Sequence, residues 1–196
     1  TSSIRNVVFL GHGGSGKTTL AEAISYSTGV ITRMGRVQDG NTISDYDKEE
    51  IKRKFSINAS VIPVEWNGLK INILDAPGYF DFVGQMEDAM SVADAAVIVV
   101  NGKAGIEVGT IKAWERRQIP RIFFITNMDD PNAKYMEIVE QLKERFGKKV
   151  APFHLPIIED GKLTGYVNVV KMGGRKFTDD LGSYTERDIP EDLTPE

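Results

Sequence analysis

The sequence contains no cysteine and no long apolar run. Without cysteine the chain can build neither a disulfide framework nor a thiolate metal site, which suits a reducing cytosol. Its longest purely apolar run, Ala95–Val100, falls far short of the roughly 20 residues that a membrane-spanning helix needs. The first residues, TSSIRNVVFLGH, lack a secretory pattern because their apolar stretch runs directly into glycines. We therefore expect a cytoplasmic protein with no membrane segment.

The chain also has no net positive charge and few histidines. The 196 residues include 24 lysines and arginines against 28 aspartates and glutamates, which gives a net charge of −4. A protein that coats nucleic acid is usually basic, so we expect no DNA partner and at most a local contact with RNA. The two histidines, His12 and His154, have no neighbours that would complete a metal or catalytic site, and we expect both to be packing residues.

Strand-like and helical patterns alternate along the chain. A hydrophobic fraction of 41% and a charged fraction of 27% are typical of a globular protein. The expected strands are residues 4–10, 59–66, 69–74, 95–100 and 121–126, and the expected helices are residues 17–27, 108–114 and 135–146. Asn67-Gly68 between two apolar runs predicts an antiparallel hairpin. The alternation predicts an α/β fold with a mainly parallel sheet and helices on both faces.

The pattern changes after Val150. Residues 153–158 and 166–170 flank Asp160-Gly161-Lys162, which predicts a second hairpin. From Gly173 onward the chain is polar, and we expect a frayed tail. We therefore divide the chain into a main domain, residues 1–150, and a small insertion or appendage, residues 151–196.

A phosphate-binding motif joins the first expected strand to the first expected helix. Residues 11–18, GHGGSGKT, match G-x-x-x-x-G-K-[ST], and we call them the phosphate loop. Glycines let the backbone N–H groups face phosphate oxygens, and the helix adds the positive end of its dipole. Lys17 would reach the terminal phosphates and the Thr18 hydroxyl would coordinate Mg²⁺. The nucleotide-binding residues expected here are Gly13, Gly14, Ser15, Gly16, Lys17, Thr18 and Thr19. The motif fits ATP and GTP equally.

An acidic residue follows a later buried strand. Asp75 ends the expected strand that precedes Ala76-Pro77-Gly78. In proteins with a phosphate loop such a carboxylate holds Mg²⁺ through water. Gly78 can present its N–H to a γ-phosphate because no side chain blocks the approach.

These motifs belong to a longer resemblance. Residues 75–106, DAPGYFDFVGQMEDAMSVADAAVIVVNGKAGI, resemble the switch II region and next strand of elongation factor G. The likeness extends to IRNVVFLGHGGSGKTTL, to DYDKEEIKRKFSI in the place of switch I, to IPRIFFITNMDD, and to LPIIEDGKLTGYVNVVKMGGRKF. The last of these is similar to the start of the family's insertion subdomain.

The resemblance implies a GTPase of translation. It implies binding of GTP, GDP and Mg²⁺, hydrolysis of GTP, and action on ribosomal RNA and proteins. Residues 1–150 would be the GTP-binding domain and residues 151–196 the beginning of the insertion subdomain. The family's last guanine motif is absent, so we expect part of a longer protein, with weakened nucleotide binding and an exposed apolar edge.

Several switch residues of the family are replaced, among them a glycine by Lys54 and an isoleucine by Phe55. The family's R-G-I-T-I appears here as Arg53-Lys54-Phe55-Ser56-Ile57, so Ser56 takes the place of the threonine that ligates Mg²⁺. Tyr79 stands where the family's histidine positions the attacking water. A tyrosine hydroxyl stays protonated at pH 7 and offers one hydrogen bond to water. The catalytic residues implied are Lys17, Gly78 and Tyr79, and we expect hydrolysis to be slower or differently triggered.

The base-reading motif is altered too. The family's N-K-x-D becomes Thr126-Asn127-Met128-Asp129, in which Asp129 would accept the two N–H donors of guanine. A second register, Asn127 with Asp130, has the spacing N-x-x-D and stays open.

Three other functions compete with an active translational GTPase. One is a nucleotide-binding paralogue with little or no hydrolysis, one is a ribosomal-protection protein, and one is a kinase or ATPase with a phosphate loop. A nucleoside kinase would need an arginine-rich lid, and the sequence shows no such run. For a ribosome-bound protein, residues 52–54 are the best candidates for contact with RNA phosphates.

Overall fold

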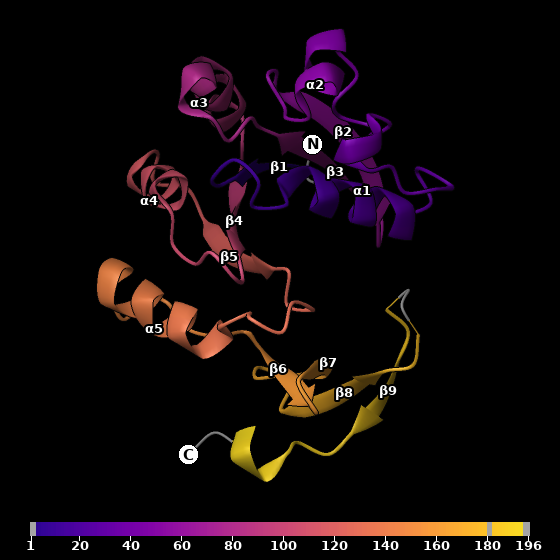
Figure 1. Cartoon of the computed structure of the whole chain (residues 1–196), viewed down its shortest axis with the longest axis vertical. Coiled ribbons are helices and arrows are strands. Elements are labelled where there is room, and N and C mark those ends of the chain that lie inside the picture. The colour runs from indigo at the N-terminus through magenta and orange to yellow at the C-terminus, as the bar shows by residue number, and fades with distance from the viewer. Residues whose placement is uncertain (1–2, 180–181, 194–196) are drawn as a thin grey trace. The chain divides into compact units, whose positions relative to one another are not determined.

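The computed structural model describes residues 3–179 and 182–193, which divide into two compact units at Thr126 (Figure 1). The elements of the first unit are β1 (Ile4–Leu10), α1 (Lys17–Ser27), η1 (Val37–Asp39), α2 (Lys48–Arg53), β2 (Ser60–Trp66), β3 (Leu69–Asp75), η2 (Phe80–Phe82), α3 (Val83–Ser91), β4 (Ala95–Asn101), α4 (Val108–Glu115) and β5 (Arg121–Thr126). Those of the second unit are α5 (Tyr135–Phe146), β6 (His154–Glu159), β7 (Lys162–Asn168), β8 (Gly173–Phe177), β9 (Tyr184–Arg187) and η3 (Glu191–Leu193). No described helix has both the length and the apolar character needed to cross a membrane.

The sheet of the first unit has the order β2-β3-β1-β4-β5. β1 pairs in parallel with β3 and β4, and β4 pairs in parallel with β5. β2 and β3 pair antiparallel across Asn67-Gly68, where both residues have a positive φ, of 49° and 76°. The structure thus confirms the predicted α/β fold with one antiparallel hairpin in its main sheet.

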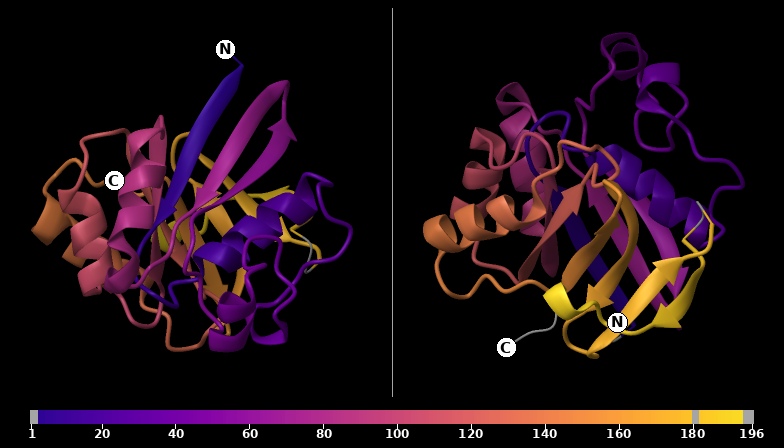
Figure 2. Two further views of the ribbon diagram at one scale, coloured as in Figure 1. Left: turned by 90° about the horizontal axis from the view of Figure 1, so that it is seen from above. Right: turned by 60° about the horizontal axis from the view of Figure 1, so that its bottom comes forward.

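Alternate residues of β1 face two different cores. Val8 and Leu10 pack in a cluster with Met90 of α3 and Ala113 of α4. Phe9, between them, packs with Ala21 of α1 and with residues of β2 and β3. Because successive side chains of a strand point to opposite faces, this alternation places α1 on one face and α3 and α4 on the other (Figure 2). The expected cover of helices on both faces is confirmed.

The second unit contains an antiparallel sheet of order β6-β7-β8-β9. The hairpin expected around Asp160-Gly161 is present as β6 and β7. The expectation of a frayed tail from Gly173 was wrong, because β8 and β9 continue the sheet through backbone pairing. β8 begins with two glycines and two basic residues, so it has no apolar alternation that would indicate a strand. The end of the expected tail, residues 194–196, lies outside the described residues.

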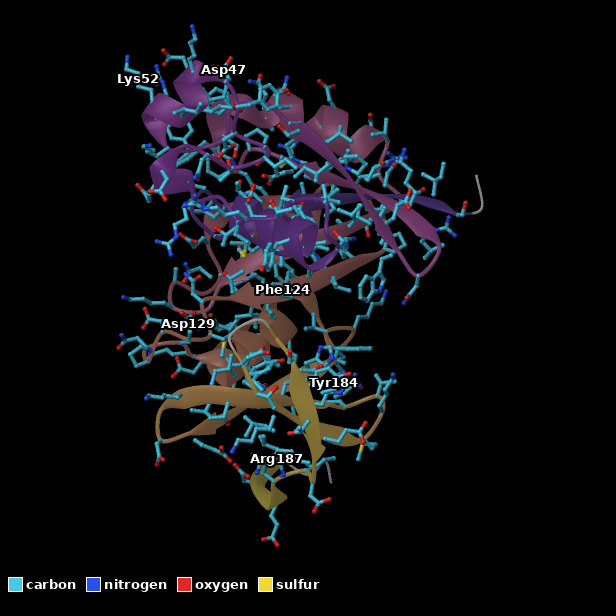
Figure 3. All side chains as sticks on the ribbon, turned by 90° about the vertical axis from the view of Figure 1, so that its right-hand side faces the viewer. Asp47, Lys52, Phe124, Asp129, Tyr184 and Arg187 are labelled. Carbon is cyan, nitrogen blue, oxygen red and sulfur yellow. The ribbon has the colours of Figure 1, made fainter. Side chains whose placement is uncertain are left out.

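The division of the structure does not coincide with the expected domain boundary. The two units meet after Thr126, so α5 counts with the second unit, whereas the resemblance predicts a GTP-binding domain reaching residue 150. The domain boundaries at 150 and 151 stay a prediction. On β5, the last strand of the main sheet, Ile122 is 60% exposed and Phe124 is 42% exposed (Figure 3). Both side chains lie on the same face of this edge strand, because alternate residues of a strand point the same way. The apolar edge expected from the absent motif stays a prediction.

Candidate nucleotide site

The phosphate loop connects β1 to α1 through a tight, glycine-dependent turn. A Cβ on Gly11, which has a φ of 136°, would lie 2.3 Å from the carbonyl oxygen of Val99. Gly16 has a φ of 95° in the left-handed region immediately before α1. Other residue types are therefore excluded at Gly11 by contact and disfavoured at Gly16 by backbone strain. The turn leaves the amino end of α1 facing the space above the loop, where a helix dipole favours an anion.

Lys17 lies beneath this loop, where it is only 6% exposed. Its ammonium donates hydrogen bonds to the carbonyl oxygens of Gly11 (3.1 Å) and His12 (2.9 Å). Burial lowers the pKa of Lys17 to about 8, and the nearby Asp75 carboxylate opposes that shift. A phosphate oxygen would supply the negative charge that this buried cation lacks, which is the role that the motif predicts for Lys17.

Oxygen atoms from three separate elements converge beside Lys17. The Thr18 hydroxyl of α1 donates to the Asp75 carboxylate at the end of β3 (2.8 Å). It also lies 3.3 Å from the hydroxyl of Ser56, in the segment after α2. The structure therefore brings together the three residues predicted to bind Mg²⁺.

The chemistry of this oxygen cluster fits Mg²⁺. One oxygen of Asp75, Oδ1, is buried and accepts no hydrogen bond of ordinary geometry from the described residues, and burial raises the pKa of this carboxyl to about 6. A hard cation with its bound waters would satisfy such an oxygen, because Mg²⁺ prefers oxygen ligands and keeps several waters. The described residues contain no group of three or more acidic or histidine side chains that would hold a metal unaided. Phosphate oxygens would have to complete the coordination.

Asp45 joins the same cluster, although the sequence motifs assign it no role. It is 3% exposed, and its Oδ1 accepts a hydrogen bond from the Ser56 hydroxyl (2.7 Å). Its second oxygen, Oδ2, is buried without a partner, and burial raises the pKa of Asp45. The sequence feature that could have pointed to Asp45 is its position as the first residue of the switch I stretch, residues 45–57. Asp45 is a further carboxylate that could hold the waters of a metal ion.

Two buried glutamates hold the switch I stretch and the loop before it. Glu22 of α1, 1% exposed, accepts hydrogen bonds from the backbone N–H groups of Gly35 (2.7 Å) and Ile43. Glu50 of α2, also 1% exposed, accepts one from the N–H of Ile57 (2.9 Å). The segment between α1 and α2 is therefore tied to α1, and Ser56 is followed directly by a residue whose backbone is held by Glu50.

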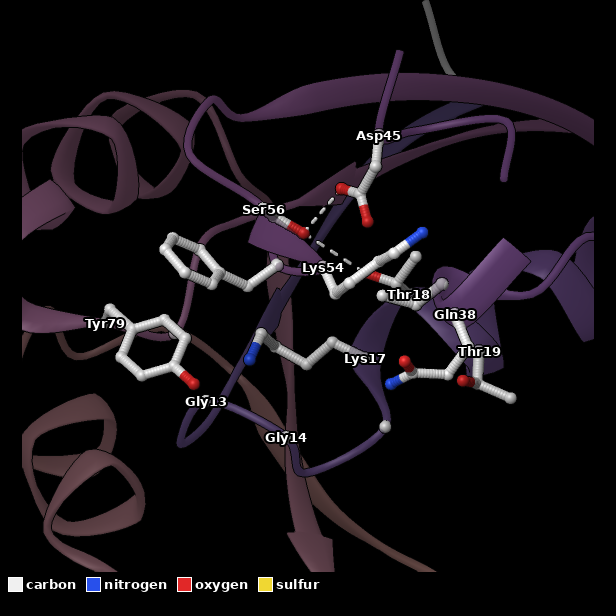
Figure 4. Close-up of a pocket in the computed structure, with 14 residues that line it drawn as sticks. Gly13, Gly14, Lys17, Thr18, Thr19, Gln38, Asp45, Lys54, Ser56 and Tyr79 are labelled. Carbon is white, nitrogen blue, oxygen red and sulfur yellow. Dashed lines mark hydrogen bonds between the residues drawn. The ribbon is translucent and has the colours of Figure 1, made fainter. Parts of the chain in front are cut away.

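Tyr79 occupies the space that Gly13 leaves empty. A Cβ on Gly13 would lie 2.7 Å from Cζ of Tyr79, so only glycine admits the ring at this place. The ring of Phe55 packs against the ring of Tyr79, with centroids 4.7 Å apart. Figure 4 shows the Tyr79 hydroxyl pointing toward the ammonium of Lys17. Two residues that depart from the family pattern, one in each switch, are thus in contact with each other.

Gly78 lies equally close to the loop. A Cβ on Gly78 would lie 2.5 Å from the Lys17 ammonium and 2.7 Å from the backbone nitrogen of Gly13. The backbone of switch II therefore approaches the phosphate loop as closely as glycine permits, which suits an N–H aimed at a terminal phosphate.

These residues surround a cavity of about 360 Å³ (Figure 4). That volume falls in the range of small-ligand sites. The cavity is lined by Gly13, Gly14, Gly16, Lys17, Thr18, Thr19, Val37, Gln38, Asp45, Lys54, Phe55, Ser56, Gly78 and Tyr79. Ser15 and Asp75, each 1% exposed, are buried and do not line it.

The base-reading residues are divided between the two units. Thr126 ends β5 in the first unit, and its hydroxyl donates to the carbonyl oxygens of Ser15 (2.7 Å) and Val100 (3.2 Å). Thr126 therefore supports the phosphate loop. In the second unit the Asp130 carboxylate accepts from the backbone N–H of Asn132 (2.8 Å), which engages it in a local turn. That bond favours Asp129 over Asp130 as the base reader.

Both histidines have packing contacts. His12 lies against Phe80, with ring centroids 6.4 Å apart, and 3.5 Å from the Glu107 carboxylate. His154 of β6 meets Tyr166 edge to face, with centroids 4.9 Å apart.

Comparison with known proteins identifies the family. The model of the elongation factor Tu GTP binding domain matches residues 2–186. The chain belongs to this family of GTP-binding domains. Elongation factor G 1 of Syntrophomonas wolfei is 33% identical over 195 residues, which are 97% of this chain and 29% of that protein. Mitochondrial ribosome-releasing factor 2 of Culex quinquefasciatus is 33% identical over 171 residues, which are 86% of this chain and 23% of that protein.

A solved structure supports the same assignment. A crystal structure of a Thermus thermophilus protein superposes with a TM-score of 0.90 at 37% identity. The match covers 98% of this chain and 29% of that one. This GTP-binding domain therefore spans less than a third of the length of these three relatives, and it is of the elongation factor G type.

Proposed function

We propose that this GTP-binding domain hydrolyses GTP with Mg²⁺, as the switch of a translation factor that acts on the ribosome. The observation that carries the proposal is the convergence of Lys17, Thr18 and Ser56 at one cavity, with the buried Asp75 carboxylate hydrogen-bonded to Thr18. A buried ammonium and a set of hard oxygens side by side are what a nucleotide phosphate with its metal ion requires.

Each residue has a distinct part in the hydrolysis. Lys17 and the N–H groups of the phosphate loop stabilise negative charge on the phosphates. Thr18 and Ser56 would hold Mg²⁺ directly and Asp75 through water, and the bound ion would neutralise charge on the terminal phosphates. Gly78 would donate its N–H to the γ-phosphate. Tyr79 would offer its hydroxyl to the attacking water, while remaining protonated itself.

Loss of the γ-phosphate would release both switches together. Ser56 is held to the nucleotide side of the site by its hydroxyl contacts with Thr18 and Asp45, and the backbone of Gly78 lies against the phosphate loop. Because Phe55 packs on Tyr79, a movement of switch I also removes support from switch II. Such an order–disorder change is a common output of GTPases.

The ribosome is the proposed partner, in the cytoplasm, through its RNA and proteins. Two relatives are named for elongation and for ribosome release, which supports this choice. At the outer end of α2, Lys52 is exposed and could meet RNA phosphates (Figure 3).

Nucleotide binding is the first test. Fluorescent GDP, GTP and ATP would be titrated with Mg²⁺ against the chain, beside Asp129→Ala and the matched control Asp130→Ala. We expect guanine-selective binding that Asp129→Ala abolishes and Asp130→Ala retains. Preference for ATP, or equal binding by both variants, would contradict the assignment of the base reader.

One observation favours a second candidate, a paralogue that binds nucleotide and hydrolyses it little. Tyr79 fills the place of the family's histidine and is held there by Phe55 and Gly13. Turnover by the full-length protein with and without ribosomes separates the two candidates. Ribosome-stimulated hydrolysis that Tyr79→Phe reduces supports the active enzyme, and unstimulated turnover supports the paralogue.

A further inference from the structure

Lys54 occupies a backbone position that favours glycine. It ends α2 with a φ of 61° and a ψ of 37°, in the left-handed region, and its N–H donates to the carbonyl oxygen of Glu50 (2.8 Å). Glycine is the usual residue at such a helix end because a side chain is disfavoured there. A lysine is therefore less stable than a glycine at this position, and ending the helix does not explain why a lysine is present.

The side chain of Lys54 lines the nucleotide cavity. Figure 4 shows it extending over the cavity with its ammonium directed away from Tyr79. The ammonium lies beside the η1 turn, because a Cβ on Gly40 would be 3.5 Å from its nitrogen. Thr19 and Gln38 line the same cavity. Lys54 thus faces the ligand space from a different wall than Gly78 and Tyr79.

The ammonium of Lys54 pairs with no carboxylate among the described residues, whereas the neighbouring Arg53 pairs with Glu49 (2.9 Å). The Asp45 carboxylate lines the same cavity, but it forms no ion pair with Lys54, and its Oδ1 accepts a hydrogen bond from the Ser56 hydroxyl (2.7 Å). Lys17 and Lys54 are therefore two positive groups facing a cavity whose proposed ligand carries several negative charges.

We propose that Lys54 binds the nucleotide, with its ammonium on oxygens of the α- or β-phosphate. The inference rests on the proposed function, since it needs a nucleotide in this cavity. The proposal places the terminal phosphate of GTP near Gly78. It places the α- and β-phosphates, which GDP and GTP share, near Lys54. It follows that Lys54 contributes equally to the affinity for GDP and for GTP.

Three substitutions at Lys54 and one matched control test the proposal. Lys54→Met keeps the length of the side chain and removes its charge. Lys54→Arg keeps the charge, and Lys54→Gly removes the backbone strain together with the side chain. The control is Lys52→Met, which removes the same charge two residues away at the outer end of α2.

We expect Lys54→Met to lower the affinity for fluorescent GDP and for fluorescent GTP by the same factor, about tenfold. That is the cost of losing one hydrogen bond to a charged group. Lys54→Arg should retain most of the affinity, and Lys52→Met should bind as the unaltered chain does. Affinity should also fall less steeply with added salt in Lys54→Met than in the control, because one charge contact is gone.

Lys54→Gly separates binding from structure. It should raise the melting temperature of the nucleotide-free chain, because glycine relieves the backbone strain. It should also lower the affinity for GDP and GTP as much as Lys54→Met does. A purely structural lysine would give a more stable variant with unchanged affinity. Unchanged affinity in Lys54→Met overturns the inference alone, and a loss confined to GTP overturns the placement at the shared phosphates. No guanine-nucleotide binding by the unaltered chain overturns the proposed function as well.

Discussion

At the scale of single residues, the absence of a side chain at Gly13 matters as much as the presence of one at Tyr79. The ring of Tyr79 covers the place where a Cβ on Gly13 would lie, and Phe55 supports the ring from the other side. These three positions form one packing unit that joins the phosphate loop to both switches. A change at any of them is therefore expected to be felt at the other two.

Gly13→Ala tests this unit. The added methyl group should displace the Tyr79 ring into solvent, since that ring is already 42% exposed. The expected cost is that of losing the aromatic contact with Phe55, about 1 kcal/mol. In a Tyr79→Ala background the same substitution should cost little, because no ring remains to be displaced. Urea unfolding of the two single variants and the double variant measures this coupling.

Gly14→Ala is the control for that cycle. Gly14 has open space around it but a φ of 81°, so alanine there is strained by its own backbone. Its cost should be the same with and without the ring of Tyr79. Equal coupling for Gly13 and Gly14 would show that the ring does not lie where we place it.

Single-residue roles were only partly accessible from the sequence. The phosphate loop and Asp75 could be assigned because their chemistry depends on residue types at fixed spacing. Asp45 and the contact between Phe55 and Tyr79 could not, because they depend on how the loop of residues 29–47 and the segment after α2 fold back onto the site. No local sequence pattern predicts that these segments fold back onto the site.

At the scale of elements, α2 is a short helix held by its own buried acid. The Glu50 carboxylate accepts hydrogen bonds from the backbone N–H groups of Asp47 (3.1 Å), Ile57 (2.9 Å) and Asn58 (2.8 Å). It thereby fixes both ends of the segment that presents Ser56. The neighbouring Glu49 is exposed and forms only a surface ion pair with Arg53.

Glu50→Ala is expected to lower the free energy of unfolding by about 2 kcal/mol, because three N–H groups lose their acceptor. Glu49→Ala should cost no more than about 0.5 kcal/mol, as is usual for an exposed pair on a helix. Urea unfolding gives both values, and hydrogen exchange at Ile57 and Asn58 should accelerate only in Glu50→Ala. Equal effects of the two substitutions would contradict the role given to Glu50.

The sheet of the second unit contains a histidine that is expected to make it sensitive to acid. His154 is an exposed residue of β6, but its partial burial and the nearby Arg175 lower its pKa below the ordinary value of 6.5. The unfolded chain therefore binds a proton more readily than the folded one as the pH falls below about 6.5. Stability that is present at neutral pH is lost in that direction.

Unfolding followed by far-UV circular dichroism between pH 7.5 and pH 5 measures this loss, with His154→Phe as the comparison. The variant keeps an aromatic ring against Tyr166 and has no group to titrate. Its midpoint should depend less on pH than that of the unaltered chain. An identical pH dependence in both would assign the effect to other groups.

Elements were predictable where the pattern of apolar residues is regular. The strands of the main sheet were placed within a residue or so of their bounds, because buried parallel strands read as apolar runs. β8 and β9 escaped prediction, since their residues are largely polar or glycine and their pairing comes from the neighbouring strands. α2 was equally hidden, as a six-residue helix has too few turns to show a period.

At the scale of the whole molecule, the two compact units are expected to unfold separately. Each has its own buried residues, such as Ile98 in the first unit and Val167 in the second. Both tryptophans of the sequence, Trp66 and Trp114, belong to the first unit. Tryptophan fluorescence therefore reports the first unit, and far-UV circular dichroism reports both.

In urea the two signals should give different midpoints in the absence of nucleotide, because two-state unfolding requires them to coincide. Saturating GDP with Mg²⁺ should move the fluorescence midpoint to higher urea. With GDP at 100 times its dissociation constant, the free energy of unfolding should rise by about 2.7 kcal/mol. ATP serves as the control and should leave it in place. Coincident midpoints without nucleotide would show a single cooperative unit.

The position of β1 in its sheet has a consequence for how the chain is made. β1 is synthesised before β3 and β4, yet it lies between them, so Val8 pairs with Leu74 and Ala96 only after both have been made. Pairing of such distant segments is slow, and the apolar face of the nascent strand has to wait for it. The phosphate loop that follows β1 cannot take its shape any earlier. GTP can therefore assist the folding of this sheet only once synthesis has passed β4.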